Sequence, residues 1–75
     1  MKATQAERVL AYIERYGSIT QYEAMLDLGV MRLAARIADL KKLGYPIKDE
    51  MVAVKNRFEE NCYVKRYSLE VDTVG

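Results

Sequence analysis

Apolar and polar residues follow a helical period along the first half of the chain and a strand period along its last third. The first helical run starts after a capping box, Thr4 with Glu7, and ends at Gly17. Its apolar positions repeat at helical spacing: Ala6, Val9, Leu10, Ile13 and Tyr16. We therefore expect a first helix here, with that apolar face turned towards a core.

A second capping box, Thr20 with Glu23, predicts that another helix begins at Gln21. The hydroxyl can accept from the backbone N–H of Glu23, while the carboxylate reaches back to the N–H of the cap residue. The segment Leu28–Val30 should end this helix, because its central glycine tolerates left-handed backbone and its apolar neighbours anchor the turn. Residues 18 and 19 should form a short extended link that pairs with a later strand.

A third periodic run follows this turn and predicts a third helix, which Gly44 and Pro46 should end. One face carries Val30, Leu33, Ile37 and Leu40, and another carries Arg32, Arg36 and Asp39. Two short helices that meet at a steep angle across a glycine turn are typical of a helix-turn-helix unit.

After Pro46 the pattern changes to a predicted hairpin. Two β-prone runs, Met51–Val54 and Tyr63–Leu69, flank a polar, turn-like segment over Asn56–Asn61. The residues expected to face the core are Ile47, Val52, Val54, Tyr67 and Leu69. A slip of one residue would exchange the two faces. The tail over 70–75 should fray.

The string EAMLDLGVMRLAARIADLKKLGYPI (Glu23–Ile47), followed by VKNRF and KRYSL, gives the chain a family resemblance. From Thr4 to Leu69 it resembles the small winged helix-turn-helix proteins of bacteriophages and prophages. The resemblance implies an α+β fold of three helices followed by a β-hairpin wing. It implies one domain over 1–75, ordered over about 4–69. It also implies DNA binding, with the third helix in the major groove and the hairpin over the backbone.

Two positions depart from the commonest helix-turn-helix pattern. Many such motifs place a small residue four positions before the turn glycine, whereas Ala24 stands five positions before Gly29. Met31 occupies the place where Ser or Thr often caps the recognition helix. The angle between the two helices could therefore be unusual, and either Ala35 or Arg36 could point most directly away from the core.

Arg32, Arg36 and Ala35 are the candidates for base contact. The two arginines stand one turn apart, and an arginine fork can bond O6 and N7 of guanine with a discrimination of about 1 to 3 kcal/mol. A plain solvated face is the alternative, in which Arg36 and Asp39 make an ordinary surface pair.

The candidates for phosphate contact lie at helix ends and on the hairpin: Gln21, Tyr22, Lys42, Lys55, Asn56, Arg57, Lys65 and Arg66. Capping, packing and the helix dipole can explain the first three equally well. Glu59 and Glu60 near the hairpin tip would repel a phosphate backbone, so the hairpin cations could instead form a charge-balanced edge. Phe58 beside them could be a groove wedge, a partner contact or a fold-back onto the hairpin.

Composition argues against an enzyme, and we expect no cofactor and no metal. The chain has no histidine, and its only cysteine, Cys62, therefore lacks the partner that a nucleophile needs. The neighbouring carboxylates at 49–50 and 59–60 should point to opposite faces of a strand, and the glycines lack phosphate-loop spacing. A chain of 75 residues also has little room for a desolvated cleft.

A lone cysteine fits a reducing cytoplasm, of a bacterial cell or a phage-infected host, and the chain has neither a signal-peptide core nor a bilayer-spanning run. The net charge of +1, from 12 basic and 11 acidic side chains, does not by itself announce a nucleic-acid partner. We expect a transcriptional regulator that binds double-stranded DNA, as a homodimer with half-sites about 34 Å apart. Helix one or the tail could provide the dimer contact. The alternative is a protein-interaction module without autonomous DNA binding.

Overall fold

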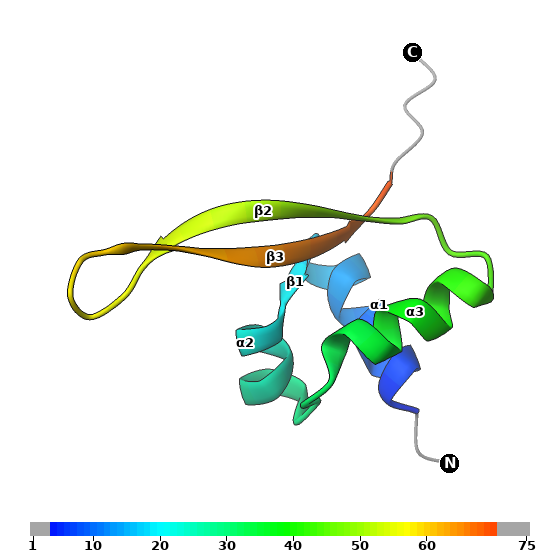
Figure 1. Ribbon diagram of the computed structural model, residues 1–75. Coiled ribbons are helices and arrows are strands. Elements are labelled where there is room, and N and C mark those ends of the chain that lie inside the picture. Colours follow the sequence, from blue (N-terminus) through cyan, green and yellow to red (C-terminus); the bar gives the residue numbers. More distant parts are fainter. Residues whose placement is uncertain (1–3, 71–75) are drawn as a thin grey trace.

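The computed structural model describes residues 4–70 and contains three helical segments followed by a long hairpin (Figure 1). The elements are α1 (Gln5–Tyr16), β1 (Ile19–Thr20), α2 (Gln21–Glu23), the π-helical turn η1 (Ala24–Leu28), α3 (Leu33–Lys42), β2 (Ile47–Lys55) and β3 (Asn61–Leu69). The hairpin of β2 and β3 lies across the helices at its base and projects beyond them at its tip (Figure 1). This order confirms the predicted fold class.

Both predicted capping boxes are present and set where the helices begin. The backbone N–H of Thr4 donates to Oε1 of Glu7 at 3.1 Å, and the N–H of Glu7 donates back to Oγ1 of Thr4 at 3.1 Å. Thr20 and Glu23 repeat the arrangement at 2.9 and 3.3 Å. Because each box satisfies two N–H groups that a helix start leaves free, the sequence fixes both starting points.

The sheet has the order β1-β3-β2, and both of its pairings are antiparallel. In β1, Ile19 pairs with Tyr67, which confirms that the short link after α1 joins a later strand. The hairpin is longer than predicted, because β2 starts at Ile47, directly after Pro46. Charged pairs across the strands support this added length, since Glu50 lies opposite Arg66.

One core joins the helices to the base of the hairpin. Its buried residues are Val9, Ile13, Ile19, Ala24, Val30, Leu33, Ile37, Leu40, Ile47 and Tyr67. Tyr16, which was expected on the buried face of the first helix, is 63% exposed, so that prediction is wrong. Its ring lies at the end of α1, against Tyr12, with a centroid separation of 4.6 Å.

The predicted core face of the hairpin is correct only at its base. Ile47 lies opposite Leu69, and Ile47 and Tyr67 are buried against the helices. Val52 and Val54 were expected on the same face, but they stand an odd number of residues from Ile47 and therefore point to the other side of the strand. The register is continuous from Ile47 opposite Leu69 to Lys55 opposite Asn61, so the one-residue slip that the sequence left open does not occur.

The π-helical turn η1 explains the unusual spacing before the turn glycine. Ala24 is fully buried, and its carbonyl accepts from the N–H of Gly29, five residues later, and from Val30 at 3.0 Å. A wider turn of this kind accommodates one extra residue inside a helix. The small residue therefore keeps its place in the core although it stands five positions before Gly29, whose φ of 69° is left-handed.

The predicted fraying of the tail concerns residues that lie, except for Glu70, outside the described part of the chain.

Candidate nucleic-acid interface

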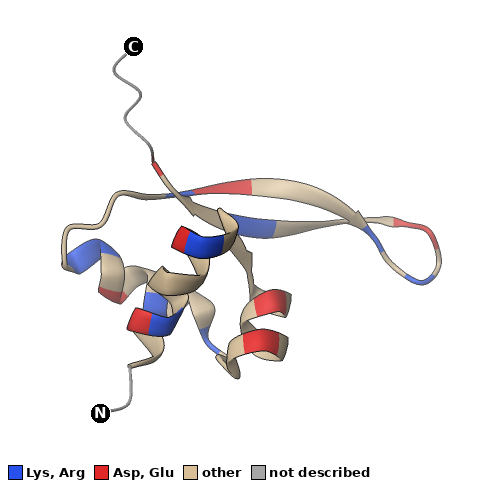
Figure 2. Cartoon of the chain, turned by 180° about the vertical axis from the view of Figure 1, so that it is seen from behind, with Lys and Arg blue, Asp and Glu red and all other residues tan. Residues whose placement is uncertain are grey.

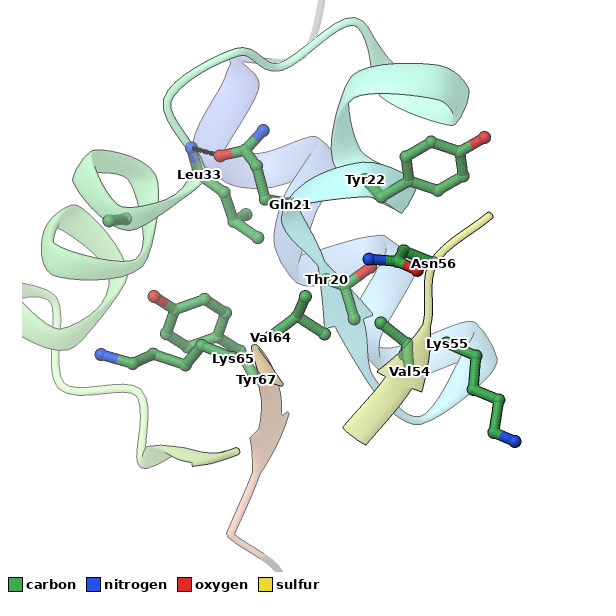
Figure 3. A pocket seen from close by; sticks show the side chains of 11 residues that line it. Thr20, Gln21, Tyr22, Leu33, Val54, Lys55, Asn56, Val64, Lys65 and Tyr67 are labelled. Atoms are coloured by element: carbon green, nitrogen blue, oxygen red, sulfur yellow. Dashed lines mark hydrogen bonds between the residues drawn. The ribbon is translucent and has the colours of Figure 1, made fainter. Parts of the chain in front are cut away.

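The start of α3 is held by a side chain from α2. Arg32 occupies the N-cap position of α3 with φ −120° and ψ 70°, and its side chain makes no capping hydrogen bond. Instead, Oε1 of Gln21 accepts the N–H of Leu33 at 2.9 Å (Figure 3). Nε2 of the same amide donates to the carbonyl of Val30 at 3.0 Å. Gln21 therefore serves as a remote cap for the third helix.

This geometry corrects two expectations about the start of the third helix. The cap is Arg32 and not Met31, and Arg32 does not share a helical stripe with Arg36, because its backbone is not helical. Gln21, which was expected at a phosphate, has both ends of its amide engaged within the chain. Arg32 remains exposed beside the first turn of α3.

The buried residues of α3 define which of its faces is free. Leu33, Ile37 and Leu40 face the core, whereas Ala34, Ala38 and Lys41 are exposed. These last three repeat at positions i, i+4 and i+7 and so form one stripe along the helix. This stripe was not among the predicted contact residues as a set, although the spacing of the buried residues could have shown it.

Arg36 lies at the flank of α3 and not on its outermost face. Its side chain is 33% exposed, and its Nε lies 3.2 Å from Oδ2 of Asp39. That nitrogen is buried and lacks a well-aligned hydrogen-bond partner, so the contact is an ion pair of poor geometry. Arg36 would have to leave Asp39 to reach a ligand, and a half-exposed pair of this kind costs little to open. Ala35 next to it is also half-buried.

A groove of about 810 Å³ separates the starts of α2 and α3 from the outer half of the hairpin (Figure 3). It is lined by Thr20, Gln21, Tyr22, Leu33, Ala34, Val54, Lys55, Asn56, Val64, Lys65 and Tyr67. The lining is mostly apolar, carries two lysines and contains no acidic side chain. Tyr22 is 67% exposed at its rim, and the side chain of Lys55 points outward from the hairpin (Figure 3).

Two of the four predicted hairpin cations are paired with acids near the base. Arg66 donates to Oε1 of Glu50 from Nε at 3.2 Å and from Nη2 at 2.5 Å, and Lys65 lies 3.4 Å from Asp49. The hydrogen bond from Arg66, with its charge, holds the pKa of Glu50 below the usual value. Within residues 4–70, Lys55 and Arg57 have no carboxylate within 4.0 Å.

The hairpin tip is organised by Asn56, another predicted phosphate contact. Its Oδ1 accepts from the N–H of Phe58 at 2.8 Å and from the N–H of Glu60 at 3.0 Å. Glu59 closes the turn with a φ of 60°, a left-handed conformation that is uncommon for a residue other than glycine. Phe58 is 83% exposed, so it does not fold back onto the hairpin.

Comparison with known proteins supports the architecture built up above. A sequence family described as a winged helix-turn-helix domain matches residues 4–72. The chain belongs to this family. Comparisons with curated proteins and with solved structures gave no match. The fold of a winged helix-turn-helix domain is, in general, a DNA-binding fold.

In terms of this family, α3 is the recognition helix and the β2–β3 hairpin is the wing. Acidic positions lie on the α2–η1 segment, on β2 near the base of the wing and in the wing turn, and basic positions lie on both wing strands and in the turn (Figure 2). The carboxylate of Glu23 in α2 is taken up by the capping box, and Asp27 in η1 accepts the hydroxyl of Tyr12 at 2.6 Å. The wing can therefore offer positive charge from Lys55 and Arg57, while Glu59 and Glu60 in the same turn carry negative charge.

Among the described residues of this winged helix-turn-helix domain, no helix has the length and apolar character needed to cross a bilayer.

Proposed function

We propose that this domain binds double-stranded DNA as a transcriptional regulator of the phage or prophage type, acting in the cytoplasm. The recognition helix α3 enters the major groove, and the wing lies over the phosphate backbone. Family membership makes nucleic acid the natural partner.

The observation that carries the proposal is the surface shared by α3 and the wing. Small side chains at Ala34, Ala35 and Ala38 let the backbone of α3 approach base edges closely, and an alanine methyl can contact the methyl group of thymine. Lys55 and Arg57 extend from the wing without acidic partners among the described residues. A helix that can sit deep in a groove and a cationic arm beside it together fit a duplex.

Arg32 is the strongest candidate for reading a guanine. It is exposed at the start of α3, the end of a recognition helix that usually contacts base edges. Arg36 takes the same role only after its guanidinium leaves Asp39. Specific reading by the pair therefore depends on Arg32 more than on Arg36.

The predicted phosphate contacts divide into direct and supporting residues. Tyr22, Lys42, Lys55 and Arg57 are exposed and contact phosphates directly in this proposal. Lys65 and Arg66 contact phosphates only after their ion pairs with Asp49 and Glu50 have opened. Gln21 and Asn56 contribute mainly by holding the start of α3 and the wing turn.

A protein-interaction module is the second candidate function. The exposed Phe58 beside Glu59 and Glu60 favours it, because an apolar, acidic apex suits a protein surface better than a phosphate backbone. In that case the domain would not bind duplex by itself, and a partner would dock on the wing.

Binding to a fluorescent random-sequence duplex at low and moderate salt tests the proposal. We expect affinity to fall steeply with salt and an Arg32→Ala, Arg36→Ala variant to lose most of it. An Arg8→Ala, Arg15→Ala variant removes the same charge from the exposed side of α1 and should bind nearly as the wild type does. If both variants lost the same amount of affinity, net charge alone would explain the loss. If the wild type bound no duplex even at low salt, the protein-interaction module would be favoured.

A further inference from the structure

The hydrogen-bonded turn at the wing tip holds the side chain of Phe58 in solvent. The side chain of Asn56 and its backbone fix the turn, since the N–H of Asn56 donates to Glu60 and the N–H of Glu59 donates to Asn56, each at 3.0 Å. The left-handed backbone of Glu59 is kept although glycine would adopt it more easily. This turn leaves the side chain of Phe58 83% exposed, the highest value among the large apolar side chains that the structure describes.

The two carboxylates that follow Phe58 make this side of the tip a poor ligand for DNA. Arg57, Glu59 and Glu60 give the turn a net charge of −1, from one cation and two carboxylates. The two carboxylates at the apex would be repelled by phosphates. The tip therefore suits an apolar site that carries cations and lacks acids.

The groove between the helices and the wing has that chemistry. Its walls include Val54, Val64 and Leu33, and its lining contains two lysines and no carboxylate. Lys65 is already shared with Asp49, so Lys55 is the cation of the lining without an acidic partner among the described residues, and its side chain extends outward from the groove (Figure 3). A groove of about 810 Å³ has ample room for one aromatic ring.

We propose that a second copy of this chain fills the groove: the wing tip of each copy docks into the groove of the other. Phe58 enters the apolar part, and the carboxylates of Glu59 and Glu60 meet Lys55 at the rim. Donor and acceptor are neighbours on one chain, because the groove is lined by Val54–Asn56 and the tip follows directly. Two wings running in opposite directions about a two-fold axis can thus make both contacts at once.

This dimer would cover the surface assigned to DNA. The groove includes Tyr22 and Lys55, which are phosphate contacts in the proposed function, and Ala34 at the start of α3. This competition rests on the proposed function: because the dimer contact and DNA use the same surface, self-association and duplex binding exclude each other. The dimer is then a storage form that DNA dissociates, in contrast to a dimer that reads two half-sites.

Sedimentation equilibrium over a wide range of protein concentration tests the contact without DNA. We expect the wild type to approach twice its monomer mass of 8.6 kDa at high concentration. Phe58→Ala should weaken the dimer at least about tenfold, as expected for a central aromatic anchor. Tyr63→Ala removes another exposed aromatic of the wing that neither lines the groove nor belongs to the tip, and it should leave the dimer intact.

A charge exchange distinguishes this contact from other ways of associating. Lys55→Glu and Glu59→Lys should each weaken the dimer, and the two together in one chain should restore it, because the opposite charges then meet in reverse. A wild type that stays monomeric at every concentration, or a dimer unaffected by Phe58→Ala, would overturn the proposal. A double variant no better than either single one would also contradict it.

The competition with DNA is measured separately, so the two proposals can fail independently. Adding duplex to the dimer should yield monomers bound to DNA, and Phe58→Ala should bind duplex more tightly at high protein concentration. If the dimer forms but neither the wild type nor the Phe58→Ala variant binds duplex at low salt, the DNA proposal alone fails. A dimer that binds duplex intact would contradict the placing of this contact over the DNA surface.

Discussion

Gln21 and Leu33 are joined across the helix turn by a hydrogen bond of 2.9 Å from the backbone N–H of Leu33 to the side-chain amide of Gln21. The bond replaces the cap that Arg32 does not supply, and the same amide holds the turn through Val30. One side chain of α2 thus sets the starting direction of the recognition helix. In the proposed function, the residues of α3 that contact base edges depend on this hydrogen bond for their position.

Replacing Gln21 should therefore lower stability and binding together. Gln21→Ala loses both hydrogen bonds and should reduce the free energy of unfolding by about 1 to 2 kcal/mol. Gln21→Glu keeps an acceptor for Leu33 but loses the donor to Val30, so its loss should be smaller. Urea unfolding followed by circular dichroism measures both. Gln5→Ala, at an exposed position in the first turn of α1, is the control. If Gln21→Ala lowers the free energy of unfolding no more than the control does, Gln21 does not act as a cap.

The π-helical turn predicts a tolerated deletion. Removing Leu26, which is 61% exposed, brings Ala24 to four residues before Gly29 and should convert η1 into an ordinary helical turn. We expect the shortened chain to stay folded, with a loss of less than about 2 kcal/mol.

Deleting Ala38 from α3 is the matched control for this experiment. Ala38 is also exposed, but its removal rotates Leu40 away from the buried face and should unfold the domain. Thermal unfolding of both variants decides the matter. Unfolding of the Leu26 variant as well would show that η1 is needed for the fold and is not an accommodated insertion.

Tyr12 should ionise at a higher pH than an ordinary tyrosine. Its hydroxyl donates to Oδ2 of Asp27 at 2.6 Å, and this hydrogen bond, more than any other cause, raises the pKa of Tyr12 to about 12. Because the folded-state pKa lies above the ordinary value of 10.0, the stabilisation is complete below pH 10 and is lost as the pH rises towards 12.

Titration of tyrosinate absorbance should thus show a late step that belongs to Tyr12. Tyr12→Phe should abolish that step, and Tyr63→Phe should leave it in place. If the late step survives in Tyr12→Phe, the contact between α1 and η1 is not formed in solution.

Local rules explain why so much of the fold could be predicted. Two capping boxes and the glycines at the ends of the helical runs are short-range signals, and each gave a correct boundary. Val52 and Val54 were assigned to the wrong side because they were placed on the face of Ile47, although the two-residue period of a strand puts residues at odd spacing on opposite faces. The length of β2 likewise depends on ion pairs with β3, sixteen residues away, that no local pattern announces.

The candidate site was less predictable, because side-chain partners decide which residues are free. The identity of Arg36 or Arg66 does not reveal that Asp39 or Glu50 already holds it. Capping was the alternative left open for Gln21, whereas the role of Asn56 in holding the wing turn was not predicted. Both residues use a side-chain amide to hold backbone groups. The exposed stripe of Ala34, Ala38 and Lys41 was not predicted as a set, because two of its three side chains carry no charge or hydrogen-bonding group.

Duplex binding mapped by NMR on the wild-type protein tests the central claim most directly. On titration with duplex, the largest changes in backbone amide shifts should fall on residues 32–38 of the helix turn and α3 and on residues 54–58 of the wing. The exposed side of α1, around Arg8 and Arg15, should change little. Shifts that gather on α1, or no shifts at low salt, would contradict the account of a recognition helix and a wing acting together on DNA.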